Sequence, residues 1–434
     1  MSAEPPAAPQ ISAGAYLRLV VLGAGIGIPA ALVAAFFLGA VHYIEDWLWH
    51  DLPDAIGYDA APWFLVVGLP LAGAAIVLVA RLFLPGDGGH PPMEGLSMHP
   101  TPVSEAPGIA LAALGTLCFG AVLGPEMPVV ALGSAVGVAV TLLVRLGPQE
   151  TRVLSTAGSF SAISALFGGP IVAGMLLVEG GLAMGTLLLP VLIPGFVAAA
   201  VGYLIFIGFG DWGGLEAPGL VVPNLPLYEG THGYDLLVGI VVGLLAAVVV
   251  VGVRRIATHV VGVGGRRGMP YLLLGGGLAV GLIAALADAL GADSQDVLFS
   301  GQASIPVLVS PDTTTKVLAI LIVAKFFAYA VSLGCGFRGG AIFPALFLGI
   351  ALASLTVVWF DVSPTLAVGV GAAAGMAAQA KLLISSMIFA GLLIGTENSD
   401  AAPAVVLAAA TAWIAVTALE RRTNAPAPNR QVAA

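Results

Sequence analysis

The sequence predicts an all-α membrane protein that crosses the bilayer many times and is built from two inverted repeats with tilted and broken helices. Hydrophobic residues make up 59% of the 434 residues and charged residues only 9%, whereas a soluble domain carries about a quarter charged residues. Apolar stretches recur from residue 16 to residue 419, as expected for a chain that spans a membrane repeatedly. Glycine and proline patterns of the first half return in the same order in the second half, which indicates the repeat.

The two ends of the chain differ from the rest in composition. Residues 1–14 and 421–434 are rich in alanine and proline or polar, so we expect a disordered tail at each end. Between them we expect a first transmembrane repeat over residues 15–222 and a second over residues 223–420. The first apolar run, residues 19–38, is too long for the core of a signal peptide and is followed by further spans, so we expect a retained helix.

The basic residues predict which connections face the cytoplasm. By the positive-inside rule, clusters of arginine and the N-terminus with Arg18 belong on the cytoplasmic side. Residues 45–59 and 211–235 carry acids and no Lys or Arg, so we expect these connections to face outward. The clustered arginines, expected in one short connection and after the last span, are Arg254, Arg255, Arg266, Arg267, Arg421 and Arg422.

Composition also argues against several classes of protein. The net charge of −9 resides mostly in loops and does not suggest nucleic-acid binding. Cys118 and Cys335 lie in apolar or glycine-rich sequence, so a disulfide framework is not indicated. No cysteine and histidine cluster has metal-ligand spacing, so we expect no metal and no cofactor; His90 and His99, beside prolines, are interpreted as loop residues. The sequence contains no phosphate loop or nucleophile elbow, so we do not expect an enzyme.

Four blocks of glycine, proline and small residues define the repeat. They recur 216, 208, 216 and 217 positions later, in the same order. A nearly constant offset distinguishes a duplication from chance matches in a chain with 58 glycines. The matched pairs are Gly23 with Gly239, Gly27 with Gly243, Pro62 with Pro270, Gly68 with Gly276, Gly73 with Gly281, Gly124 with Gly340, Pro128 with Pro344, Gly133 with Gly349, and Gly158 with Gly375.

The most informative segment is the first break, Gly124-Pro125-Glu126-Met127-Pro128, because the apolar residues 109–123 and 129–144 around it carry no charge. Placing a carboxylate at bilayer depth costs on the order of 3 kcal/mol. Capping a helix start contributes about 0.3–1 kcal/mol, up to ~2 when partly buried. Because capping alone does not offset the cost, we interpret Glu126 as a functional group that faces protein or a water-filled path.

The second break, Gly340-Ala341-Ile342-Phe343-Pro344, repeats the frame of the first. Interruptions by glycine and proline at corresponding positions of two repeats point to a transporter's binding site. Each break begins a half-helix whose free N–H groups face a protein-lined cavity, and helix starts bind anions without a full cation. Two converging starts therefore predict a weak, reversible anion site, and Arg338 beside the second break is a source of further positive potential.

At these motifs the chain resembles the CLC superfamily of chloride channels and chloride–proton antiporters, in a distant bacterial branch. Residues 120–128 resemble the family's segment with the gating glutamate, and residues 339–344 resemble its second-half filter. The resemblance covers about residues 16–419. The other matching positions are residues 167–170 leading to Glu179, Lys325, and residues 374–376.

The resemblance implies a homodimer in the cell inner (plasma) membrane, with one pore per subunit for chloride or a similar small anion. Glu126 is then the gate: its carboxylate occupies the anion site and leaves when it is protonated or displaced. An intramembrane enzyme would need a second catalytic group, which the first break does not offer, and a structural scaffold leaves the buried acid unexplained. The anion path is expected to include Gly88, Gly124, Pro125, Met127, Pro128, Gly340, Ala341, Ile342, Phe343 and Pro344.

Three departures from the family pattern concern the anion path itself. Pro125 and Met127 flank the glutamate where the family has arginine and glycine. Gly88 stands where the family's first filter loop has an ion-contacting serine. No tyrosine follows Tyr329, so the family's late ion-contacting tyrosine has no counterpart.

A fourth departure concerns the alternative function, proton-coupled anion antiport. The family's exchangers end one helix in two acids; Glu179 matches the first, and Gly180 replaces the second, their internal proton acceptor. Glu179 is either part of a proton path or a carboxylate at a helix end. Three basic residues in apolar sequence also have two interpretations. They either raise the electrostatic potential of the pore or pair with acids such as Glu397. These residues are Lys325, Arg338 and Lys381.

Overall fold

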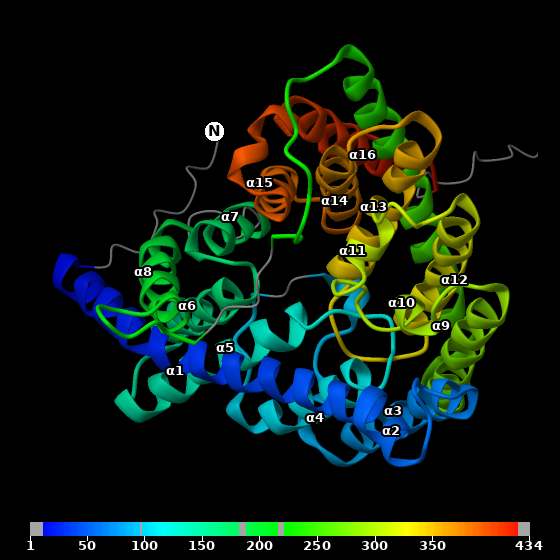
Figure 1. Cartoon of the computed structure of the whole chain (residues 1–434). Helices are drawn as coiled ribbons and strands as arrows, with labels where there is room; N and C mark the ends of the chain where they lie inside the picture. The colour runs from blue at the N-terminus through cyan, green and yellow to red at the C-terminus, as the bar shows by residue number, and fades with distance from the viewer. Residues whose placement is uncertain (1–11, 96–97, 182–187, 216–220, 424–434) are drawn as a thin grey trace, which may run out of the picture.

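A computed structural model describes residues 12–95, 98–181, 188–215 and 221–423, and most of these residues are folded into helices (Figure 1). In these ranges β-pairing is limited to two isolated bridges, one of which joins Gly124 to Gly340. The all-α architecture predicted from composition is therefore confirmed. Most of both predicted tails lies outside the described residues; the helices begin at Ala13 and end at Thr423, slightly beyond the limits of 15 and 420.

Within the described residues, the first half of the chain forms eight α-helices, with a π-helical turn at Trp47–Asp51 and short 3-10 turns at Pro85–Gly88, Pro92–Glu94 and Val103–Glu105. They are α1 (Ala13–Asp46), α2 (Leu52–Ala55), α3 (Trp63–Phe83), α4 (Ala106–Leu117), α5 (Glu126–Val144), α6 (Pro148–Leu166), α7 (Pro170–Gly180) and α8 (Leu188–Ile207).

The second half forms eight more, with a 3-10 turn at Thr396–Ala401. They are α9 (Gly233–Leu290), α10 (Ser294–Val297), α11 (Ile305–Leu308), α12 (Thr315–Gly334), α13 (Ile342–Phe360), α14 (Pro364–Ala380), α15 (Leu383–Ile394) and α16 (Ala402–Thr423).

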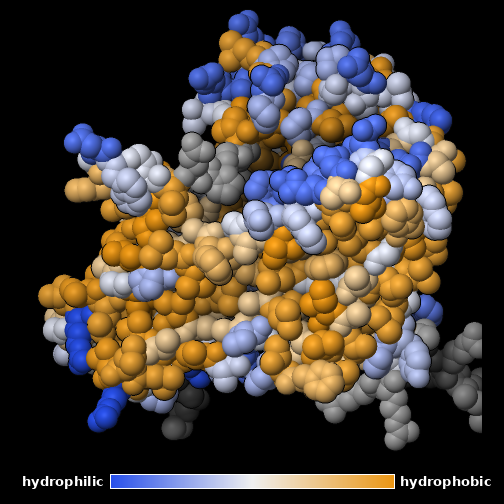
Figure 2. All heavy atoms as spheres, turned by 60° about the horizontal axis from the view of Figure 1, so that its bottom comes forward, coloured by the Kyte–Doolittle hydropathy of each residue, from blue (hydrophilic) through white to orange (hydrophobic). Residues whose placement is uncertain are grey.

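Nine helical segments in the described ranges are long and apolar enough to cross a bilayer. Figure 2 shows hydrophobic residues over the middle of the displayed face, with hydrophilic residues gathered mainly along its upper part. Shorter apolar helices, including α7 and α15, fill space between the spans. The chain is a multi-pass membrane protein.

The arginine-rich stretch connects two spans, but its first two arginines are helical. Arg254 and Arg255 lie within α9, assigned from Gly233 to Leu290. Its two apolar spans, Gly233–Gly262 and Gly268–Leu290, lie on either side of the arginine-rich stretch, and both contact the end of α12. A Cβ at Gly334 would lie 3.1 Å from Ala257 Cα, and a Cβ at Gly276 would lie 2.5 Å from the Cβ of the next residue, Cys335. A straight helix would separate residues 257 and 276 by about 28 Å, so the chain changes direction between the two spans.

Equivalent helices of the two halves confirm the inverted repeat. Helices α5 and α13 each have 19 residues, each begins at a break, and each ends at a left-handed residue, Arg145 or Asp361. Each then leads into a helix that starts with proline, α6 or α14. Helix α5 packs closely on α6, since a Cβ at Gly133 would lie 2.5 Å from the Gly158 carbonyl oxygen. Small residues thus permit the tight packing that lipid alone does not drive.

Candidate functional site

The two breaks lie directly against each other. The Gly124 N–H donates to the Gly340 carbonyl at 2.8 Å, and the Gly340 N–H donates to the Gly124 carbonyl at 2.6 Å. This reciprocal antiparallel pairing joins residues 216 positions apart. It places the first turns of α5 and α13 next to each other, as the sequence predicts.

Glu126 extends from α5 to the start of α13. Its side chain is fully buried, and Oε1 accepts from the Ile342 N–H at 2.6 Å. The N–H groups of Phe343 and of Glu126 itself also face the carboxylate. Oε2 is buried and has no hydrogen-bond partner in the described part of the chain. Glu126 therefore satisfies donors of the opposite repeat, and half of its acceptor capacity stays unused.

Glycine is required on both sides of this carboxylate. A Cβ at Gly340 would overlap the carboxyl group of Glu126, and a Cβ at Gly124 would overlap Oε2. The Gly124 position also faces the Phe343 ring, 2.9 Å from the same added Cβ. The two glycines that frame the breaks thus form the walls of the carboxylate's binding space.

Three aromatic rings support the second break. Phe343 stacks on Phe167 with centroids 5.6 Å apart and meets Phe389 edge-on at 6.1 Å, and Phe167 meets Phe389 at 5.1 Å. All three are buried. The sequence motifs include Phe343 and Phe167, but they do not identify Phe389, which comes from the apolar helix α15 and has no local signal.

Tyr329 is a further neighbour that sequence reasoning did not assign to the site. Its hydroxyl donates to the Ala341 carbonyl at 2.6 Å, and its side chain is fully buried on α12. The hydrogen bond fixes the peptide that precedes the first N–H groups of α13. Tyr329 therefore positions the break rather than contacting Glu126 directly.

The remaining residues of the two motifs have packing roles in the structure. Pro125 is the residue before the first turn of α5. Met127, Pro128 and Pro344 are buried within the first turns of α5 and α13. Proline is tolerated here because the first-turn N–H groups have no partner within the helix.

Gly88 lies in a different place from the Glu126 site. The atoms nearest to a Cβ added there are Ala112 Cβ at 2.8 Å and the Cγ atoms of Arg338 and Arg81, both at 3.3 Å. Gly88 thus packs against Arg81 and Arg338, which help to line a cavity of about 940 Å³ together with Asp87, Thr258 and Cys335.

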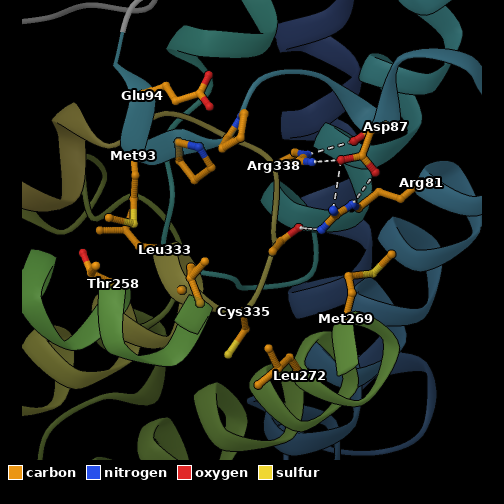
Figure 3. Close-up of a pocket in the computed structure, with 15 residues that line it drawn as sticks. Arg81, Asp87, Met93, Glu94, Thr258, Met269, Leu272, Leu333, Cys335 and Arg338 are labelled. Atoms are coloured by element: carbon orange, nitrogen blue, oxygen red, sulfur yellow. Dashed lines mark hydrogen bonds and ion pairs between the residues drawn. The ribbon is translucent and has the colours of Figure 1, made fainter. Parts of the chain in front are cut away.

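Two arginines bind one aspartate at the edge of this cavity (Figure 3). Arg81 donates to both carboxylate oxygens of Asp87 at 2.9 Å, and its Nη1 donates to the Gly336 carbonyl at 2.9 Å. Arg338 forms an ion pair with Asp87 and donates to its carbonyl at 2.9 Å. Burial, with the neighbouring Arg81, lowers the pKa of Arg338 to about 10, so its guanidinium stays charged at neutral pH.

Glu179 binds the start of another helix. Its carboxylate accepts from the Ile384 N–H at 2.8 Å, the Ser385 N–H at 2.7 Å and the Ser385 hydroxyl at 2.6 Å. Glu179 is the second-last residue of α7, just before Gly180, and the donors lie in the first turn of α15. The interpretation of Glu179 as a carboxylate at a helix end is what this geometry supports.

Of the other two cations, Lys381 pairs with an acid, one of the two interpretations of the sequence, whereas Lys325 is held by backbone carbonyls. Lys325 is fully buried and donates to the carbonyls of Leu298 at 2.7 Å and Asp296 at 3.2 Å, rather than pairing with Glu397. Lys381 lies just after α14, in a left-handed conformation, and forms an ion pair with Glu420. Sequence could not reveal the partners of Lys325, because backbone carbonyls leave no trace in residue type.

The family comparison decides the wider assignment. Residues 72–416 match the model of the family described as voltage gated chloride channel. The chain belongs to this family. Its members are channels or transporters that move anions across membranes, and the resemblance seen in the sequence motifs is confirmed.

Curated relatives agree with the family. The chain is 29% identical over 349 residues to the ion-transport protein YfeO of Escherichia fergusonii, covering 77% of this chain and 78% of the relative. The protein of the same name from a strain of Escherichia coli has the same identity and coverage.

Solved structures share the fold. A slow cyanobacterial Cl⁻/H⁺ antiporter superposes with a TM-score of 0.73 at 17% identity, over 93% of this chain and 95% of that one. A CLC-type fluoride/proton antiporter gives a TM-score of 0.69 at 19% identity, over 93% and 96% of the two chains. A eukaryotic CLC transporter gives 0.65 at 18% identity, over 93% and 72%.

Proposed function

We propose that this protein passes chloride or a similar small anion across the membrane, and that Glu126 is its gate. One observation carries the proposal: a fully buried carboxylate of the first repeat occupies the N–H groups at the start of the second repeat's half-helix. Helix starts favour negative charge. A permeant anion and the Glu126 carboxylate therefore compete for the same donors.

The gate opens when the carboxylate leaves or loses its charge. Oε2 has no hydrogen-bond donor in the described part of the chain. A proton can therefore bind Oε2 without displacing a donor, and it would remove the buried charge. A neutral carboxyl binds the helix start less well than an anion does. Lower pH is therefore expected to increase anion flux.

The test is chloride flux from proteoliposomes over a range of pH. Glu126→Gln keeps the shape of the side chain but does not titrate, so flux is expected to lose its pH dependence. Glu397→Gln, at an exposed acid away from the site, is the matched control and should keep it. If the flux of Glu126→Gln still depends on pH, Glu126 is not the gate.

Proton-coupled antiport is the second candidate, and the unpaired Oε2 of Glu126 favours it because that atom can bind a proton. Against it, the only acid of the predicted inner pair is Glu179, whose carboxylate accepts three hydrogen bonds from α15. Uphill proton movement driven by a chloride gradient would establish antiport. Anion flux without proton movement would establish a channel.

We further propose that the protein works as a homodimer in the plasma membrane, with one anion path per subunit. The family and the curated relatives support this setting. Flux measured with chloride, fluoride and nitrate in parallel identifies the preferred anion. The mass of the purified protein in detergent, measured by light scattering, tests the dimer.

A further inference from the structure

The cavity beside Arg81 and Arg338 has the chemistry of an anion site in its own right. Two guanidinium groups, one from α3 and one from the connection between α12 and α13, converge on the carboxylate of Asp87 (Figure 3). Only 12% of the Arg81 side chain and 5% of the Arg338 side chain are exposed, against 56% for Asp87. The cations are therefore fixed within the protein, and their counter-ion lies on the solvent side.

The cations are held by contacts that do not depend on the Asp87 side chain. The Arg81 guanidinium donates through Nη1 to the Gly336 carbonyl, and the Arg338 guanidinium donates through Nε to the main-chain carbonyl of Asp87, which a substitution of the Asp87 side chain keeps. Arg338 uses Nε and Nη2 on Asp87, and its Nη1 has no partner within the described ranges. Removing the Asp87 carboxylate would thus leave a preformed pair of guanidinium groups facing the cavity.

Asp87 is held in place against the preference of its own backbone. Its φ is +49°, a conformation disfavoured for a residue with a Cβ. Gly86, Gly88 and Gly89 around it also have positive φ. The neighbouring glycines tolerate many conformations, so displacement of the carboxylate would not strain the backbone at their positions.

The two guanidinium groups at the cavity face two carboxylates: Asp87 is in direct contact with them, and Glu94 acts on Arg338 without an ion pair. Asp87 balances one of the two guanidinium groups. Glu94 also lines the cavity but lies across from the arginines in Figure 3 and forms no ion pair with them in the described part of the chain. Arginine forks bind anions through several directed N–H groups, so a small anion fits this position.

We propose that Arg81 and Arg338 bind a small inorganic anion, and that Asp87 is a tethered competitor which the anion displaces. This proposal rests on the proposed function in one respect: the bound anion is taken to be one that moves on to the Glu126 site. Arg338 precedes Gly340 by two residues, a backbone distance of at most about 7 Å. The arginine site and the break that holds Glu126 therefore share the connection between α12 and α13.

The experiment is chloride titration of the purified full-length protein by calorimetry. Asp87→Asn removes the competing charge and keeps the side chain's size, so chloride affinity should rise roughly tenfold, as expected when a charge-assisted contact no longer competes. Asp87→Gly, which suits the left-handed backbone, should give the same gain and guards against misfolding. Asp312→Asn, at an exposed acid elsewhere, is the control.

Adding Arg338→Gln to Asp87→Asn should abolish the gain. The arginine site is wrong if chloride affinity is unchanged in both folded Asp87 variants, or if the gain in affinity persists after Arg338→Gln. The ion pairs would then serve only to stabilise the fold. Failure of the Glu126 gate is recognised separately, because it appears as persistent pH dependence in Glu126→Gln flux. The two proposals can therefore fail independently.

Discussion

The Glu126 carboxylate belongs to one repeat and is held by the backbone of the other. The donor nearest to it, the Ile342 N–H, is among the first N–H groups of α13, which the helix itself cannot satisfy. An anion that replaces the carboxylate would meet the same donors in the same positions. Competition at this point needs no lysine or arginine, which keeps binding weak enough for conduction.

The first prediction concerns the space around this carboxylate. In Gly340→Ala the added methyl group overlaps the Glu126 carboxyl group, so anion flux should fall at least about tenfold because the shared space is filled. Removing the carboxylate as well, in Gly340→Ala/Glu126→Ala, should restore flux by making room. Proteoliposome flux measures both variants.

Gly275→Ala is the matched control for that substitution, because nothing lies within 4 Å of a Cβ added there. It should leave flux unchanged. A double variant that stays as slow as Gly340→Ala would mean that the methyl group disrupts the pairing of the breaks, and not the space of the carboxylate.

Sequence identified Glu126 because charge is conspicuous in an apolar run, but it could not show that Gly88 packs against Arg81 and Arg338. The matching position was inferred from a loop motif, and the path of that loop depends on ion pairs between Asp87 and a residue 251 positions away. Such partners leave no local pattern. Tyr329 and Phe389 were missed for the same reason, since each looks like an ordinary residue of an apolar helix.

At the scale of helices, the structure uses carboxylates to join elements whose backbone donors would otherwise be unpaired. Glu126 links α5 to α13, and Glu179 links α7 to α15. Both connections run from a helix of one half to the first turn of a helix of the other. This arrangement stabilises broken helices inside a membrane, where unpaired N–H groups are costly.

The second prediction tests Glu179 as such a link. In Glu179→Gln an amide NH₂ replaces one acceptor and the charge is lost, which should lower the free energy of unfolding by about 1–2 kcal/mol. The midpoint of thermal unfolding in detergent should fall accordingly, while the ratio of protons to anions transported should stay the same. Glu229→Gln, at an exposed acid, should change neither quantity.

A Glu179→Gln variant with normal thermal unfolding and altered proton movement would contradict this prediction. It would favour the proton path, the other interpretation offered by the sequence. The stability and transport measurements are both needed, because a carboxylate at a helix end can serve either purpose.

At the scale of the whole molecule, the fold could be predicted further than the site. Hydropathy, the repeated breaks and the family motifs suffice for an all-α inverted repeat, because each is a property of sequence order. The helical state of Arg254 and Arg255 could not be predicted, since arginines at the end of a span are compatible with a loop or with a helix. The Arg254–Glu420 ion pair, at 2.9 Å, and the Lys381–Glu420 pair join α9, α14 and α16 at one end of the molecule.

That end should face the cytoplasm, which is the third prediction. Positive charge is retained inside, so a cysteine in place of exposed Arg255 should react with a membrane-impermeant maleimide only after spheroplasts are permeabilised. A cysteine in place of Tyr58, 47% exposed in the acidic connection after α1, should react in intact spheroplasts. The unmodified chain is the control, because Cys118 and Cys335 are only 0% and 7% exposed. The reverse pattern of labelling would mean that the protein has the opposite orientation in the membrane. The cavity beside Arg81 and Arg338, which Thr258 of the same region of α9 lines, would then receive anions from outside the cell.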